Sequence, residues 1–245
     1  MKTLLAVSLI MLSFCAESAR EFLASPTQTI WTTDVPLTTY PCTIAAWCKL
    51  PPTNTVATGV IAGFGSTTDN RRLMIYVLPS ANLSRVSVQS VDASGTTGVA
   101  SSVVNYKSNT WVHVTGVFAS ATSRTVYYNG GSQGSSFGAV NTTGLNTFSI
   151  GSIYAGTNGF TNRVIIIAAE VGVWNVALSA NEVALISGAG DPTEALPPRY
   201  MRPDKLVIYA PLDSRNSEYE WLRNSLQSSN APAYIDHPAI HRPNP

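Results

Sequence analysis

Charged side chains are scarce in this sequence. Of its 245 residues, 15 are Lys or Arg and 14 are Asp or Glu, which gives a formal net charge of +1. The basic residues form no run, and the clearest cluster is the pair Arg71 and Arg72. A nucleic-acid-binding surface needs a basic stripe that follows the phosphates. The composition therefore argues against nucleic acid as a partner.

Carboxylates that could act as a pair are also rare. Glycoside hydrolysis uses two carboxyl groups, about 5–5.5 Å apart in retaining enzymes and further apart in inverting ones. Between Val35 and Ala169 the acidic residues are Asp69 and Asp92, and they lie on different segments. Glu170 stands alone in its apolar segment. The sequence therefore predicts a protein that is not an enzyme of the glycosidase type.

Cysteine is nearly absent, with three residues in the chain. Cys42 and Cys48 are six positions apart on one predicted strand. The even spacing places both on the same face, about 20 Å apart, which is too far for a disulfide bond between them. We therefore expect no intramolecular disulfide, and both thiols are predicted to be buried apolar fillers.

Long apolar runs are missing except at the start of the chain. Lys2 precedes the 12-residue apolar run Leu4–Cys15, which is too short to span a bilayer. This pattern predicts a signal peptide over residues 1–19, with cleavage after Ala19 or after Ala16, and hence a secreted or extracellular protein without a membrane span. A mis-assigned start or a short buried N-terminal segment is the alternative.

What the sequence has in abundance is strand and turn signals. The runs Trp111–Phe118 and Arg124–Tyr128 alternate apolar and polar residues around a turn of small residues. The second run stops at Asn129-Gly130, a strong hairpin signal because both residues tolerate positive φ. A meander of this kind is typical of an all-β protein, either a sandwich or an antiparallel two-sheet jelly roll.

Further strands and one helix follow from the same patterns. Ser179 and Glu182 form a capping box, and Gly188 suits a helix C-terminus, so a short helix is expected near 179–188. Turn signals recur about every ten residues, as a sandwich requires. The other predicted strands are 42–49, 60–64, 72–78, 83–91, 148–153, 164–174 and 206–212.

Five segments in order carry a family resemblance: CTIAAWCKLP, WVHVTGVF, TVYYNGG, FSIGS and AAEVGVWNVALSANEV, across residues 42–188. They resemble the laminin-G-like jelly rolls of the concanavalin A-like lectin and glucanase superfamily, and RPDKLVIYAPLD resembles the closing strand of bacterial and phage-encoded relatives. The resemblance implies two face-to-face antiparallel sheets with adjacent first and last strands. It implies a domain over 20–190, completed by a linker, the closing strand 206–212 and a C-terminal arm within 191–245.

A calcium site is a second implication of resemblance. The segment TTDNRRLMIYV resembles the pentraxin loop that supplies an Asp-Asn calcium pair, which would be Asp69 and Asn70 here. Pentraxins supply further acidic ligands after the following I-G strand, whereas this chain reads SIGSIYAGTNG there. The residues themselves favour a hairpin turn with an Asx hydrogen bond. We therefore expect no cofactor, with a weak calcium site as the alternative.

Polar and aromatic residues near predicted strand ends are the candidate ligand-binding set: Asp69, Asn70, Arg71, Tyr154 and Asn158. Together with the family resemblance, they favour an exported, non-catalytic module that binds a glycan or surface polymer. The alternative is a structural or interaction protein with protein partners, such as a phage virion decoration, fibre or surface-assembly subunit. That alternative is motivated by the low charge, the hydroxyl-rich faces and the phage-like C-terminal segment.

Overall fold

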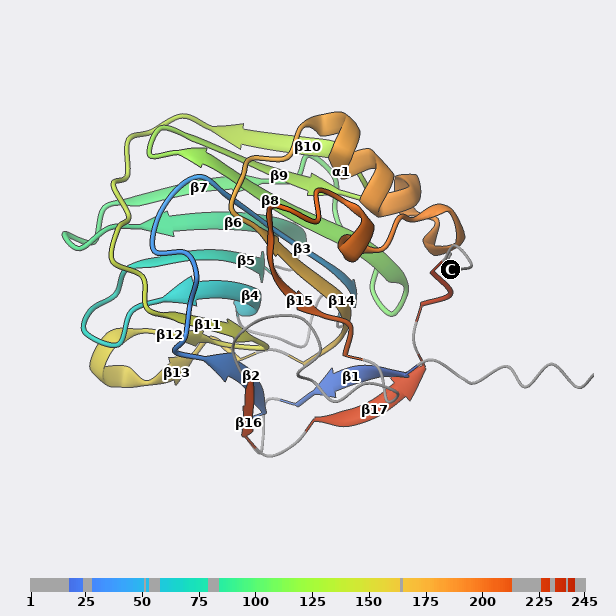
Figure 1. The fold of residues 1–245 in the computed structure, drawn as a ribbon, viewed down its shortest axis with the longest axis horizontal. Helices are drawn as coiled ribbons and strands as arrows, with labels where there is room; N and C mark the ends of the chain where they lie inside the picture. The colour runs from blue at the N-terminus through green and yellow to red at the C-terminus, as the bar shows by residue number, and fades with distance from the viewer. Residues whose placement is uncertain are drawn as a thin grey trace, which may run out of the picture.

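The computed structural model describes residues 18–23, 28–50, 52, 58–78, 84–163, 165–212, 226–229, 232–236 and 238–240. Two antiparallel sheets pack face to face (Figure 1). Sheet A contains, in order, β10 (Gly131–Ser136), β9 (Ser123–Tyr128), β8 (Trp111–Ser120), β3 (Cys42–Lys49), β14 (Ile166–Trp174), β1 (Ser18–Phe22) and β17 (Ala233–Asp236), with β15 (Leu206–Ala210) also paired to β14. Sheet B contains β16 (Gln227–Ser229), β2 (Thr29–Thr32), β11 (Thr147–Ile150), β4 (Gly59–Gly65), β5 (Arg72–Leu78), β6 (Arg85–Val91) and β7 (Thr97–Ser101). The short strands β12 (Ile153–Tyr154) and β13 (Phe160–Thr161) form a separate hairpin. The predicted all-β, two-sheet jelly roll is confirmed.

The central strands of sheet A follow the sequence pattern closely. β3 pairs with β8 without a break from Cys42↔Phe118 to Lys49↔Trp111, and β8 pairs in turn with β9. The turn after β9 has φ of 52° at Asn129 and 72° at Gly130. Both values are positive, as the tight hairpin turn predicted from this dipeptide requires.

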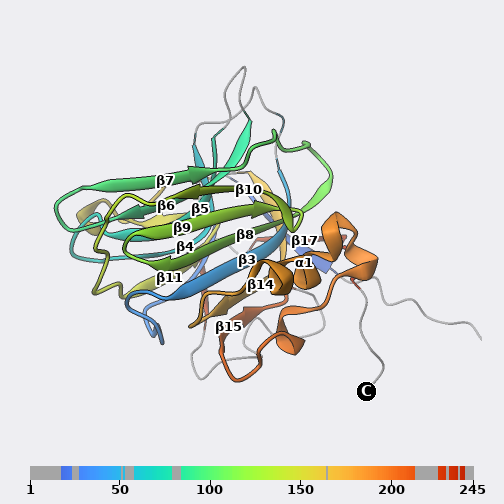
Figure 2. The ribbon, with the colours of Figure 1, turned by 90° about the horizontal axis from the view of Figure 1, so that it is seen from above.

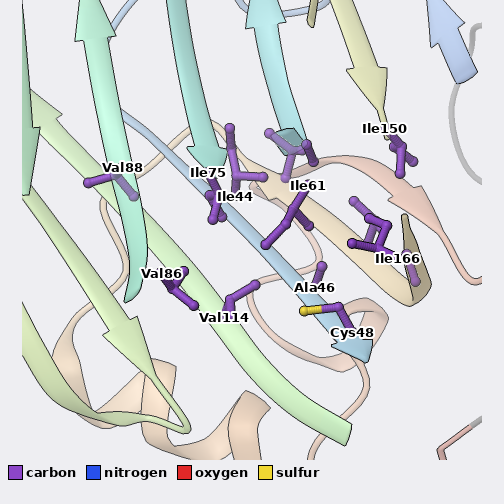
Figure 3. Close-up of a cluster of buried hydrophobic side chains, with 14 of the residues drawn as sticks. Ile44, Ala46, Cys48, Ile61, Ile75, Val86, Val88, Val114, Ile150 and Ile166 are labelled. Atoms are coloured by element: carbon purple, nitrogen blue, oxygen red, sulfur yellow. The ribbon is translucent and has the colours of Figure 1, made fainter. Parts of the chain in front are cut away.

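The space between the sheets is filled by the inward-facing residues of both. Ile44, Ala46 and Cys48 alternate along β3 and point toward Ile61 and Ile75 of sheet B (Figure 3). Each fully buried Ile contributes about 1.5–3 kcal/mol relative to an exposed position. Cys48 and Cys42 are free thiols in this core, which confirms the predicted role of both as apolar fillers.

A helical layer covers the outer face of sheet A (Figures 1 and 2). It consists of α1 (Ala180–Ser187) and the short 3-10 segments η2 (Gly188–Gly190), η3 (Pro192–Glu194) and η4 (Pro198–Tyr200). α1 has the expected capping box: Ser179 N–H donates to Glu182 Oε2 at 2.8 Å, and Glu182 N–H donates back to Ser179 Oγ. Val183 and Ile186 of α1 pack on Trp174 of sheet A, so burial of this apolar face holds the helix in place.

Sequence patterns missed β1, β2, β13, β16 and β17, and also the pair β7 and β10. Both are rich in small polar residues and lack a strong apolar alternation. β10 lies at one edge of sheet A and β7 at one edge of sheet B, and the two strands lie side by side. The close approach is possible because Gly134 has no side chain to meet the Ser101 carbonyl. A Cβ at Gly134 would lie 1.8 Å from that oxygen. Tertiary contact between the sheets, and not local propensity, therefore places these strands.

The two ends of the described chain pair with each other. β1 lies between β14 and β17, so the first and last strands of sheet A are adjacent, but the last strand is β17 and not the predicted closing strand 206–212. The strand predicted over 206–212 is β15, which pairs with β14. β1 begins at Ser18, within the range expected for a signal peptide, and Ala19 is fully buried. In the described part of the chain, none of the helices has the length and apolarity to cross a membrane.

Candidate functional site

A cleft of about 360 Å³ opens at one end of sheet B. Three connections meet there: residues 66–71 between β4 and β5, residues 92–96 between β6 and β7, and the β12–β13 hairpin with its 3-10 turn η1 (Gly156–Asn158) (Figure 1). The lining residues are mainly hydroxyl, amide and glycine groups: Thr68, Asp69, Asn70, Ala93, Ser94, Gly95, Ala155, Gly156, Thr157 and Asn158. Segments almost ninety positions apart in sequence thus form one surface.

The structure brings three of the five predicted site residues into this cleft. Asp69 and Asn70 come from the β4–β5 connection, and Asn158 comes from η1. Arg71 does not line the cleft itself, but its ion pair with Asp69 links it to the cleft wall. Tyr154 lies outside: it packs edge-to-face on Phe160, with 4.9 Å between the ring centroids.

The ion pair between Arg71 and Asp69 dominates the electrostatics of the cleft. Arg71 Nε–H donates to Asp69 Oδ1 at 2.8 Å and Oδ2 at 2.7 Å, and a terminal guanidinium nitrogen lies 2.6 Å from Oδ2. The Arg71 backbone N–H also donates to Oδ1 at 3.1 Å, which confirms the predicted Asx turn. These bonds to Arg71 lower the pKa of Asp69 from 3.8 to about 2.

Arg71 also connects the cleft to a further loop, the one between β10 and β11. Its Nη1 donates to the Thr143 carbonyl oxygen at 2.7 Å. The same loop is held to the β4–β5 connection by Asn146, whose Oδ1 accepts from the Thr67 N–H at 2.9 Å and whose Nδ2 donates to Thr67 Oγ1 at 2.8 Å. Hydrogen bonds of this kind fix the wall on which Asp69 sits.

The β6–β7 connection supplies the wall that sequence reasoning missed. Asp92 Oδ1 accepts from the Ser94 N–H at 2.9 Å, the Ser94 hydroxyl at 2.7 Å and the Thr96 N–H at 2.9 Å. The Ser94 hydroxyl bond is the main cause of the lowered Asp92 pKa. Asp92 thereby orients Ser94 and Gly95 at the cleft. The D-x-S-G-T pattern signals such a turn, but only the topology shows which loop it faces.

The β12–β13 hairpin forms the remaining wall. The Gly156 N–H donates to the Ser66 carbonyl at 2.9 Å, which ties η1 to the end of β4. At the base of the hairpin, Phe160 packs edge-to-face on Tyr154 and on Trp31 of β2, with 5.5 Å between the Phe160 and Trp31 centroids. All three aromatic side chains are half-buried. This aromatic row anchors the hairpin that carries Asn158.

The donor set of the cleft is a poor match for a calcium ion. Calcium takes six to eight oxygens, usually with several carboxylates among them. Asp69 is the one carboxylate among the residues that line the cleft, and Arg71 occupies both of its oxygens. Within the described ranges, no group of three or more His, Cys, Asp and Glu side chains could hold a metal. A cation would therefore compete with the guanidinium for Asp69.

Glu170 and His113 are buried ionisable residues outside the cleft, and both have structural partners. Glu170 sits in β14 with φ of 51°, and its Oε2 accepts from the Tyr209 hydroxyl at 2.6 Å. His113 is buried in β8, next to the ring of Trp47, and desolvation lowers its pKa to about 3. Neither residue reaches the cleft.

Comparisons with known proteins agree with this architecture. The model of the concanavalin A-like lectin/glucanases superfamily matches residues 24–184. The SAP-like pentraxin from Limulus polyphemus is similar with a TM-score of 0.65 and 13% identity, over 91% of this chain and 96% of the pentraxin. A candidate carbohydrate-binding protein from Bacteroides ovatus has a TM-score of 0.60 and 16% identity, over 90% of this chain and 60% of that one. The binding domain of botulinum neurotoxin DC has a TM-score of 0.53 and 10% identity, over 74% of this chain and 44% of that one. No curated protein matches the chain.

Proposed function

The chain belongs to the concanavalin A-like lectin/glucanases superfamily, and we propose that it is a non-catalytic module that binds neutral glycans in the cleft around Asp69, Ser94 and Asn158. The proposal includes action outside the cell, which the apolar N-terminal run supports. It also includes independence from calcium.

The chemistry of the cleft wall is the observation that carries this proposal. Its hydroxyl and amide groups can both donate and accept hydrogen bonds, as the hydroxyls of a sugar do. The Asp69 carboxylate is neutralised by Arg71 and hydrogen-bonded by it, so the wall carries no unpaired carboxylate. Hydrolysis would need a second carboxyl group facing the first. The arrangement suits recognition of an uncharged polyol better than bond cleavage.

The structural neighbours support the ligand class. The Bacteroides ovatus protein is named for carbohydrate binding, and the botulinum neurotoxin DC binding domain was solved in complex with SialylT. Their low identity to this chain shows a shared fold, so the step from that fold to glycan binding is part of our proposal. The structural-subunit alternative predicts particle attachment or stable oligomers instead of saturable sugar binding.

Calorimetric titration after a glycan-array screen tests the proposal. We expect saturable binding of at least one neutral glycan, unchanged by a chelator. Asn158→Ala and Ser94→Ala should each weaken binding about tenfold, since a lost hydrogen bond costs about 1–1.5 kcal/mol. Asn175→Ala is the matched control, because Asn175 is exposed and lies outside the cleft. Absence of binding to every glycan, with and without calcium, would overturn the proposal.

A further inference from the structure

The cleft contains one of the two Asn-Gly pairs of the sequence, Asn158-Gly159, and the other is Asn129-Gly130. We propose that Asn158 is a site of spontaneous deamidation, and that this reaction remodels the η1 wall of the cleft as the protein ages. The covalent step stands on the local geometry alone. Its effect on ligand binding rests on the proposed function.

Asn158 is free to react in its folded setting. Its side chain is exposed, and its amide makes no hydrogen bond within the part of the chain that the structure describes. Gly159 has no side chain, and no atom lies within 4 Å of the place where its Cβ would be. Three backbone bonds hold this turn: Asn158 N–H to the Ala155 carbonyl and Gly159 N–H to the Gly156 carbonyl, each 3.2 Å, and Ala155 N–H to the Gly159 carbonyl at 3.0 Å. Such a short 3-10 turn opens at low cost.

Asn129 has the same neighbour but a different environment. Its Oδ1 accepts from the His113 N–H at 2.8 Å, so the side-chain amide is fixed. Gly190 packs against it, because a Cβ at Gly190 would lie 2.8 Å from the Asn129 amide carbon. A Cβ at Gly130 would lie 2.1 Å from Ser187 Oγ, which shows how closely α1 covers this turn. The fold thus protects one Asn-Gly pair and exposes the other.

The reaction needs only water. The Gly159 backbone nitrogen attacks Asn158 Cγ, the new N–Cγ bond closes a succinimide ring, and the Cγ–Nδ2 bond breaks. The side-chain nitrogen leaves as ammonia and takes the proton from Gly159. Water then opens the ring at either carbonyl. One route yields aspartate, and the other yields isoaspartate, in which the main chain runs through the former side-chain carbon.

Both products change the cleft. Aspartate adds a carboxylate to a wall whose other carboxylate, Asp69, is already paired with Arg71, so the cleft becomes acidic. Isoaspartate lengthens the main chain inside η1. This segment is fixed on one side by the hydrogen bond from Gly156 N–H to the Ser66 carbonyl and on the other by the packing of Phe160 on Tyr154. Either change displaces the hydrogen-bonding groups that face a ligand, so binding of a neutral glycan weakens.

Ageing of the full-length protein in mildly alkaline buffer tests the proposal. Peptide mass spectrometry with isoaspartate detection should show conversion at Asn158 about tenfold faster than at Asn129, because Asn129 reacts only after local unfolding. In denaturant the two sites should react at similar rates, which shows that the folded structure causes the difference. Asn158→Gln should abolish the fast phase and leave the Asn129 reaction unchanged.

Two outcomes overturn the proposal: equal rates at both sites in the folded protein, or an Asn158 that stays intact while the denatured chain reacts. Binding of fresh and aged protein to a neutral glycan is measured separately. If neither binds, the proposed function fails and the deamidation result still stands. If fresh protein binds and fully converted protein binds equally well, the remodelling of the cleft is refuted.

Discussion

Replacement of Arg71 by Met is the most informative single perturbation of the cleft. Met keeps a long side chain but removes the guanidinium that bonds both oxygens of Asp69 and the Thr143 carbonyl. The Asp69 pKa should then rise from about 2 toward its ordinary 3.8. Since the pKa of the folded state is depressed, the ion pair stabilises the protein above pH 3.8, and this contribution is lost as the pH falls toward 2.

The magnitude follows from the pKa and the exposure of the pair. The difference between 3.8 and about 2 sets an upper bound of about 2.5 kcal/mol, at about 1.36 kcal/mol per pKa unit. The side chains of Arg71 and Asp69 keep 23% and 29% of their surface exposed. Solvent screening therefore reduces the contribution to about 1 kcal/mol, which lowers the Tm by about 2–4 °C in a chain of this size.

Urea unfolding of wild type and Arg71→Met between pH 7 and pH 3, with carboxyl NMR titration of Asp69, measures both effects. The stability deficit of Arg71→Met should shrink as the pH falls. Arg72→Met is the matched control, because Arg72 Nε donates to Gln89 Oε1 at 3.2 Å and has no carboxylate partner among the described residues. Its deficit should stay constant. An Asp69 that titrates near 3.8 in the wild type, or a pH-independent Arg71→Met deficit, would refute the reasoning.

Three further predictions concern the surroundings of the cleft and the core. Phe160→Ala should cost about 2 kcal/mol in urea unfolding and weaken glycan binding, since the half-buried ring anchors the hairpin that carries η1. Burial raises the pKa of Cys42 and Cys48, so a thiol reagent should label neither in the folded protein and both in denaturant; rapid native labelling would contradict this. Desolvation lowers the pKa of His113 from 6.5 to about 3, so the unfolded state alone takes up this proton between those values. Between pH 6.5 and about 3, this uptake should lower the stability of the wild type by up to about 1.36 kcal/mol per pH unit, and His113→Gln should remove that slope; unfolding measured across this range tests it.

The sequence predicted most of the fold because its strongest signals are local. Alternation and the Asn129-Gly130 turn placed β8 and β9, and the capping box of Ser179 placed α1 within one residue at each end. β3 and β5 match their predicted bounds. The limits of this reasoning appear at β7 and β10, whose small polar residues become strands because each is an edge beside an existing sheet.

In the candidate site, too, sequence predicted the local contacts and missed the long-range ones. Asp69, Asn70 and Arg71 form a contiguous turn, so their Asx geometry could be read from neighbouring residues. The partnership of that turn with Ser94 and Asn158 depends on which loops emerge at the same end of sheet B, and residue spacing along the chain carries no such information. Alternation of side chains therefore determined that two sheets form. Their packing and strand order decided that this carboxylate faces the hydroxyls and amides of other loops, because those contacts exist only after distant segments meet.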